Sequence, residues 1–150
     1  MGAMSRPPLD ALDVSRIRQI DESMRGHVEE LLRSTAAGAD RGRLLQRLKG
    51  LDSDMHHHFE MEEQGGFLDG ALAHDPRLSA MAADLLRQHP MLSHDLKQLI
   101  TTVENAPAEP AWRATFAEQL HGFINRLVEH ERAENRLVQD AYHDDIGEVD

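Results

Sequence analysis

Two segments of the chain each carry a histidine followed four residues later by a glutamate. They are His58 with Glu62 and His130 with Glu134. Residues four apart lie one above the other on a helix, so each pair would present an imidazole and a carboxylate to the same neighbour. Mixed nitrogen and oxygen ligands of this kind suit transition-metal ions such as iron. The two pairs therefore predict a metal site, provided that both lie on helix faces that point inward.

Helical phase decides which polar residues near the first pair can join such a site. His58 continues an apolar stripe that contains Leu51 and Met55, and Glu62 lies one turn further along the same face. At about 100° per residue, a histidine one or two positions before His58 lies about 100° or 200° around the helix. The residues rotated off this face are His56, His57, Glu60 and Glu63.

Two further histidines fall on the apolar stripes of other segments. His27 lies on the first stripe of the chain and His89 on the third. In an antiparallel bundle, four such segments can bring six ligating side chains to one level. The predicted metal ligands are His27, His58, Glu62, His89, His130 and Glu134.

The elements that must position these residues are four helical segments. In each segment apolar residues recur three and four positions apart, and β-branched residues, which disfavour helix, are sparse. Polar or glycine-rich breaks separate the segments, which cover roughly residues 14–35, 41–64, 76–104 and 111–142. We predict an all-α fold, an up-down-up-down antiparallel four-helix bundle.

The predicted bundle fills most of the chain. It covers residues 14–143, with residues 144–150 as a C-terminal tail. Residues 1–13 would form an N-terminal arm whose first four residues, MGAM, look like a cloning tag remnant before a second start methionine.

Composition excludes several other functions. The 150 residues contain no cysteine, which rules out disulfides and thiolate metal sites. A net charge of −11 argues against a nucleic-acid surface, because there is no basic stripe to contact phosphates. No apolar run reaches the length of a membrane span or forms the core of a signal peptide. We expect a soluble cytoplasmic protein with no nucleic-acid or membrane partner.

A cation would explain two glutamates on buried faces, because carboxylates are almost never fully buried unpaired. The main alternative without a metal is a pair of buried His–Glu hydrogen bonds. Four imidazoles and two carboxylates exceed the four ligands of one zinc ion, and calcium and magnesium prefer oxygen. Iron and manganese accept mixed ligands, and two carboxylates can bridge two ions. Ligand type leaves iron, manganese and a mixed pair open.

The order of these elements resembles the hemerythrin family, specifically its HHE cation-binding domains. One histidine on the first and third helices alternates with an HxxxE pair on the second and fourth, and the contexts HFEMEE and EHERAE also resemble that family's motifs. The similarity extends from about residue 14 to residue 142. It implies a hemerythrin-like fold and a non-haem centre of two iron ions per chain with a bridging oxo or hydroxo group. In that centre Glu62 and Glu134 would bridge the ions and the four histidines would be terminal ligands.

One position departs from the oxygen-carrying hemerythrins, which have a further histidine one turn after the ligand of the third helix. Ser93 stands there in this chain. The neighbouring His94 has the wrong phase on a straight helix, about 140° from His89. A kink at Pro90 could nevertheless rotate His94 inward. Without the extra imidazole, the iron pair would be more open to water or peroxide.

Three functions from different classes follow from these observations. The first is a di-iron protein that binds or senses dioxygen, or handles iron. The second is a di-iron enzyme that disproportionates or reduces peroxide, or processes nitric oxide. The third is a metal-free helical interaction module. Dioxygen or peroxide is the expected small ligand, and the oligomeric state is open.

Overall fold

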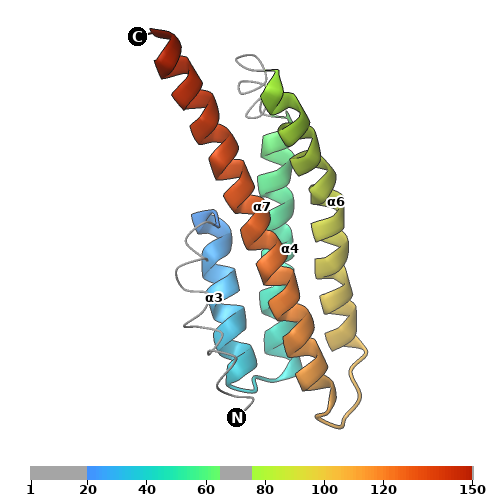
Figure 1. Cartoon of the computed structure of the whole chain (residues 1–150). Coiled ribbons are helices and arrows are strands. Elements are labelled where there is room, and N and C mark those ends of the chain that lie inside the picture. Colours follow the sequence, from blue (N-terminus) through green and yellow to red (C-terminus); the bar gives the residue numbers. More distant parts are fainter. Residues whose placement is uncertain (1–19, 65–75, 150) are drawn as a thin grey trace, which may run out of the picture.

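In the part of the chain that the structure describes, the fold consists of four antiparallel helices. The computed structural model describes residues 20–64 and 76–149, with side chains described as far as residue 141. The helices are α3 (Glu22–Ala36), α4 (Arg41–Gln64), α6 (Arg77–Glu104) and α7 (Trp112–Val149). They run alternately up and down, and α6 and α7 extend beyond the level at which α3 begins (Figure 1). No strand occurs among the described residues, so the predicted all-α bundle is confirmed. The predicted arm over residues 1–13 lies outside the described part.

Helix α3 begins later than the apolar pattern suggests. The predicted segment starts at residue 14, but residues 14–19 lie outside the described part, and Ile20 and Asp21 are not helical. The Asp21 carboxylate accepts a hydrogen bond of 2.9 Å from the Ser23 backbone N–H, so Asp21 caps the helix. Aspartate is favoured at this position because it satisfies a backbone donor that has no partner within the helix.

A short turn reverses the chain between α3 and α4. Gly38 adopts a φ of +70°, and the Ala39 N–H donates to the Ser34 carbonyl over 2.9 Å. Glycine suits this left-handed position because it has no Cβ to clash with the backbone. Asp40 then accepts a hydrogen bond of 2.8 Å from the Arg43 N–H at the start of α4. The turn therefore sets α4 directly against α3.

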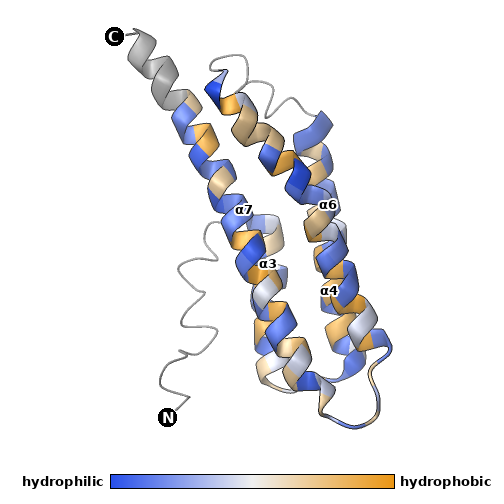
Figure 2. Ribbon diagram, turned by 45° about the vertical axis from the view of Figure 1, so that its right-hand side comes forward, coloured by the Kyte–Doolittle hydropathy of each residue, from blue (hydrophilic) through white to orange (hydrophobic). Residues whose placement is uncertain are grey.

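The interior consists of two apolar clusters separated by a polar layer. The larger cluster includes Phe59, Leu92 and Val128, and the smaller one includes Leu85 and Leu137. On α6 and α7, apolar residues of both clusters flank the polar layer. Apolar and polar residues mix along every helix, as expected of amphipathic helices with one buried face (Figure 2). The polar layer contains the histidines and glutamates singled out above.

None of the described helices combines the length and the apolar character that crossing a bilayer requires.

Candidate metal centre

The structure brings five of the six predicted ligands together in the polar layer. Helix α4 supplies His58 and Glu62, α6 supplies His89, and α7 supplies His130 and Glu134. All are buried except His58, whose side chain is 18% exposed. Glu62, His89, His130 and Glu134 form one group whose ligand atoms all lie within 4.8 Å of one another.

Helical phase on α4 agrees with this arrangement. Glu62 is buried, whereas His56, His57 and Glu60 are exposed. The apolar stripe differs from the expected one at a single step, because the fully inward position after Met55 is Phe59. His58 therefore lies at the edge of the buried face of α4 and reaches the centre from there.

Short contacts between imidazole nitrogens and carboxylate oxygens define the centre. The His58 Nε2 lies 3.0 Å from the Glu62 Oε2, and the His89 Nε2 lies 3.2 Å from the Glu62 Oε1. The His130 Nε2 lies 3.1 Å from the Glu134 Oε2. Glu134 also lies 3.7 Å from the Nε2 atoms of both His58 and His89. Glu62 and Glu134 thus stand between the three imidazoles.

The donor set fits a metal ion. Despite these short distances, several of the inward nitrogen and oxygen atoms are fully buried and make no hydrogen bond of acceptable geometry. They are the Nε2 atoms of His58, His89 and His130, the Oε1 of Glu62, and the Oε2 atoms of Glu131 and Glu134. Buried polar atoms are almost always hydrogen-bonded, and leaving one unsatisfied costs about 1–3 kcal/mol. Cations bound among these atoms would satisfy all six through coordination.

His27 is the predicted ligand that the structure does not bring to the centre. Its Nε2 lies 2.8 Å from the Asp54 Oδ2, and its ring lies against Gly50. Asp54 and Gly50 precede His58 by four and eight residues, which is about 6 and 12 Å along α4. On α3 the buried residues include Met24, Val28 and Leu31 but not His27, so His27 stands beside the core, at a different level from the centre.

Glu131 is a member of the centre that the sequence reasoning missed. It is 3% exposed, and its Oε2 lies 3.4 Å from the His58 Nε2. With His58, Glu62 and Glu134 it forms a second group whose ligand atoms lie within 4.8 Å of one another. Its spacing in the sequence could have indicated this position, because Glu131 follows Leu127 by four residues and precedes Glu134 by three. That spacing places it on the apolar face of α7.

Further polar residues hold the rings from outside the centre. The His89 Nδ1 donates a hydrogen bond of 2.7 Å to Glu63, and the His130 Nδ1 donates one of 2.7 Å to the Gln88 side-chain oxygen. Because these oxygens only accept, the Nδ1 atoms carry hydrogen, which leaves each Nε2 lone pair for a metal. Asp21 lies 3.6 Å from the His58 Nδ1, an ion-pair distance that is too long for a hydrogen bond. Helical phase alone had placed Glu63 off the buried face, and it does lie outside the centre.

In the absence of a metal, the centre holds protons. Burial alone would lower the pKa of His58, but the nearby carboxylates of Glu131, Glu134 and Glu62 favour its charged form and raise the pKa to about 12. Burial opposes charge on His89 as well, yet Glu134, Glu62 and Glu63 raise its pKa to about 9.

The two α7 carboxyls respond differently to the same surroundings. Burial raises the pKa of Glu131 to about 7, although His58 acts in the opposite direction. Burial also favours the neutral form of Glu134, but His130, His58 and His89 hold the pKa of that carboxyl well below its usual range. Of the two α7 carboxyls, Glu134 is therefore the one that is held in its charged form.

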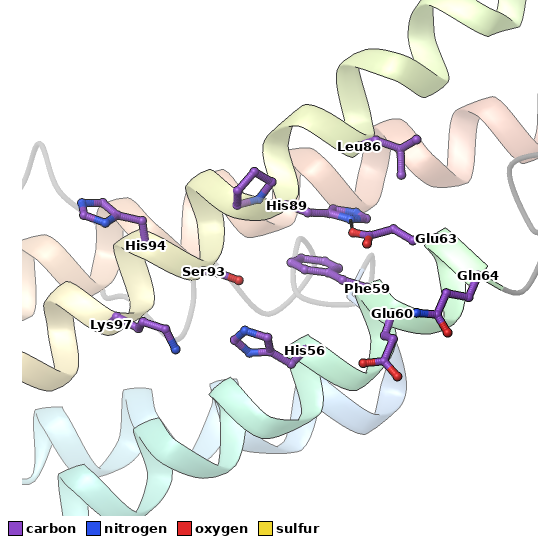
Figure 3. A pocket seen from close by; sticks show the side chains of 11 residues that line it. His56, Phe59, Glu60, Glu63, Gln64, Leu86, His89, Ser93, His94 and Lys97 are labelled. Atoms are coloured by element: carbon purple, nitrogen blue, oxygen red, sulfur yellow. Dashed lines mark hydrogen bonds and ion pairs between the residues drawn. The ribbon is translucent and has the colours of Figure 1, made fainter.

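A groove of about 900 Å³ runs between α4 and α6 and reaches the edge of the centre. Phe59 lines it and stacks on His89 with ring centroids 3.8 Å apart. Figure 3 shows the Phe59 ring beside His89, with Ser93 lining the same groove. His94 is exposed and bonds to Gln98 at 3.2 Å, so Pro90 does not turn it into the centre.

The fold and the buried histidine–glutamate cluster together define a cation-binding four-helix bundle. The comparison with protein families gives the same class: residues 12–142 match the family described as the hemerythrin HHE cation binding domain. The chain belongs to this family, as its motif order predicted. Searches of the curated proteins and of the solved structures found no match.

Proposed function

We propose that this protein holds two iron ions in the centre and binds dioxygen, as a carrier, a sensor or a protein that handles iron. Glu62 and Glu134 would be shared by both ions, because each belongs to both groups of facing ligand atoms. When bound, iron would supply reversible one-electron chemistry toward dioxygen or peroxide. The residues of the chain position the ions and limit access to them.

The observation that carries this proposal is the set of buried inward atoms without hydrogen bonds. Three imidazole nitrogens and three carboxylate oxygens, from α4, α6 and α7, converge on one space between two apolar clusters. A metal-free interaction module has no use for such a layer, because buried unsatisfied groups lower the stability of the bundle. Membership of a cation-binding family supports the same conclusion.

Two features favour a small ligand such as dioxygen. Ser93 offers no imidazole, so fewer protein ligands compete for the ions than in the oxygen-carrying relatives that the sequence resembles. The α4–α6 groove reaches Phe59 and His89, and Phe59 forms an apolar wall beside the centre. An apolar wall admits a neutral diatomic molecule more readily than an ion.

The test is the metal content of anaerobically iron-loaded protein, together with its absorption spectrum before and after oxygen and then peroxide are added. We expect two irons per chain and a charge-transfer band that appears with oxygen and reverses when oxygen is removed. A band that decays while peroxide is consumed over many turnovers would identify an enzyme instead. Protein that retains no metal would overturn both readings.

A further inference from the structure

We propose that the centre contains two unlike cation positions, and that Glu131 makes one of them a carboxylate-rich position that accepts manganese in place of iron. This inference deepens the proposed function and rests on its two-ion centre. It assigns to Glu131 a ligand role, and to each ion a separate set of residues.

The two positions follow from the two groups of converging ligand atoms. The histidine-rich position is formed by His89 and His130 with Glu62 and Glu134. The carboxylate-rich position is formed by His58 and Glu131 with the same two glutamates. Two imidazoles and two carboxylates therefore surround the first position, whereas one imidazole and three carboxylates surround the second.

Contacts with the protein hold the Glu131 side chain in the second position. Its Oε1 accepts a hydrogen bond of 3.2 Å from the Asp21 backbone N–H at the start of α3. Its Oε2 is buried, makes no hydrogen bond, and lies 3.4 Å from the His58 Nε2. One oxygen thus holds the side chain while the other points into the centre.

Because their ligands differ, the two positions should also differ in the metal that they prefer. Imidazole nitrogen favours iron over manganese, whereas carboxylate oxygen suits manganese and other hard divalent cations. Exchanging an imidazole for Glu131 therefore weakens the discrimination against manganese at that position. It also brings a third negative charge next to the shared carboxylates, which a second divalent cation would neutralise.

Competition between the two metals tests the proposal. Wild-type protein loaded anaerobically with iron is dialysed against a tenfold excess of Mn²⁺ over Fe²⁺, and both metals are counted per chain. We expect one iron and one manganese. Retention of two irons, or replacement of both by manganese, would show that the positions are alike and overturn the proposal.

A variant assigns the manganese to its position. Glu131→Gln keeps the size of the side chain but replaces the charged ligand by a weak one, so we expect one iron per chain and no retained manganese. Glu60→Gln makes the same chemical change on the exposed face of α4 and should keep both ions. An E131Q protein that binds both metals as the wild type does would refute the ligand role.

A measurement on the wild type makes the result independent of how the variant folds. Anomalous scattering at the manganese edge, in crystals of mixed-metal protein, should place manganese beside His58 and Glu131. A manganese peak beside His89 and His130 would contradict the assignment. If the wild type keeps two irons per chain in the presence of manganese and still binds oxygen, only this inference is refuted. If the wild type retains no iron at all, the proposed function is refuted as well.

Discussion

At the level of single residues, helical phase separates a glutamate that reaches the centre from one that faces solvent. Glu62 contacts two imidazoles, whereas Glu60 is exposed on the same helix. Replacing Glu62 by Gln should abolish the retention of both metal ions, because the two proposed positions share this carboxylate. Metal analysis after anaerobic loading measures the effect, with Glu60→Gln as the matched control. Equal losses in the two variants would refute the phase argument.

Glu63 acts on the centre through His89 rather than directly. Its carboxylate holds the His89 Nδ1–H at 2.7 Å, which orients the ring and increases its basicity. Replacing Glu63 by Ala should weaken metal affinity by about 10- to 100-fold. Glu63→Gln retains an accepting oxygen and should restore much of the loss. Competition with a chromophoric chelator measures both affinities, and wild-type affinity in the alanine variant would exclude this role.

At the level of elements, the start of α3 stabilises the helix and also holds a residue of the centre. Asp21 caps the helix through the Ser23 N–H, and its own N–H donates to Glu131. Replacing Asp21 by Ala should lower the free energy of unfolding by about 1 kcal/mol, the usual cost of losing such a cap. Asn also caps helices, so Asp21→Asn should remain close to the wild type. Urea denaturation of the three proteins provides the comparison.

The axial position of α3 can also be tested through His27. The structure pairs this residue with Asp54, about one turn of α4 away from His58. We expect His27→Ala to retain the wild-type metal content. Its free energy of unfolding should fall by less than about 1 kcal/mol, because the lost pair is partly exposed. Loss of metal from this variant would mean that His27 is a ligand, as the sequence pattern suggests.

At the level of the whole molecule, stability should depend on metal. A ligand that binds only the folded state stabilises it, and removing the ions leaves three carboxylates facing one another in the interior. Chelation followed by dialysis should therefore lower the melting temperature measured by circular dichroism. Restoring iron under anaerobic conditions should reverse the change. An unchanged melting temperature would favour the metal-free pairs of histidine and glutamate.

The metal-free protein should also lose stability as the pH rises. The pKa of His89 rises from 6.5 to about 9 on folding, so the stabilisation from its proton is complete below pH 6.5 and is lost as the pH passes 9. His58 acts in the same direction, with a pKa of about 12. Urea denaturation of chelated protein at pH 6.5, 8 and 9.5 should show a steady decline. Stability that increases over this range would show that the imidazoles are neutral in the folded state.

The same protons link metal binding to pH. Imidazole must be deprotonated to coordinate a metal, so binding at pH 7 should release protons from His58 and His89. The sequence could indicate that these residues share a buried site. The size of the shift depends on the distances to Glu62, Glu131 and Glu134, which only the folded structure sets.

Sequence patterns predict the local features of this protein. The spacing of apolar residues predicted four helices, and the phase of His58, Glu62, His130 and Glu134 predicted which of the polar residues would lie between the helices. These predictions hold because 3.6 residues per turn fix the direction of a side chain relative to its own helix. His89 followed from the same rule, since it is buried on α6 as its stripe indicates. The family was also evident from the order of these motifs.

The relative placement of the helices, in contrast, follows from the folded structure alone. The Asp21 cap sets where α3 begins, and the packing of α3 on α4 places His27 at the level of Asp54. Glu131 enters the centre because α7 packs close enough to the start of α3 and to α4 for its carboxylate to contact Asp21 and His58. Helical periodicity contains no information on axial register or on the separation of helix axes, because both arise from contacts between residues that are distant in the chain.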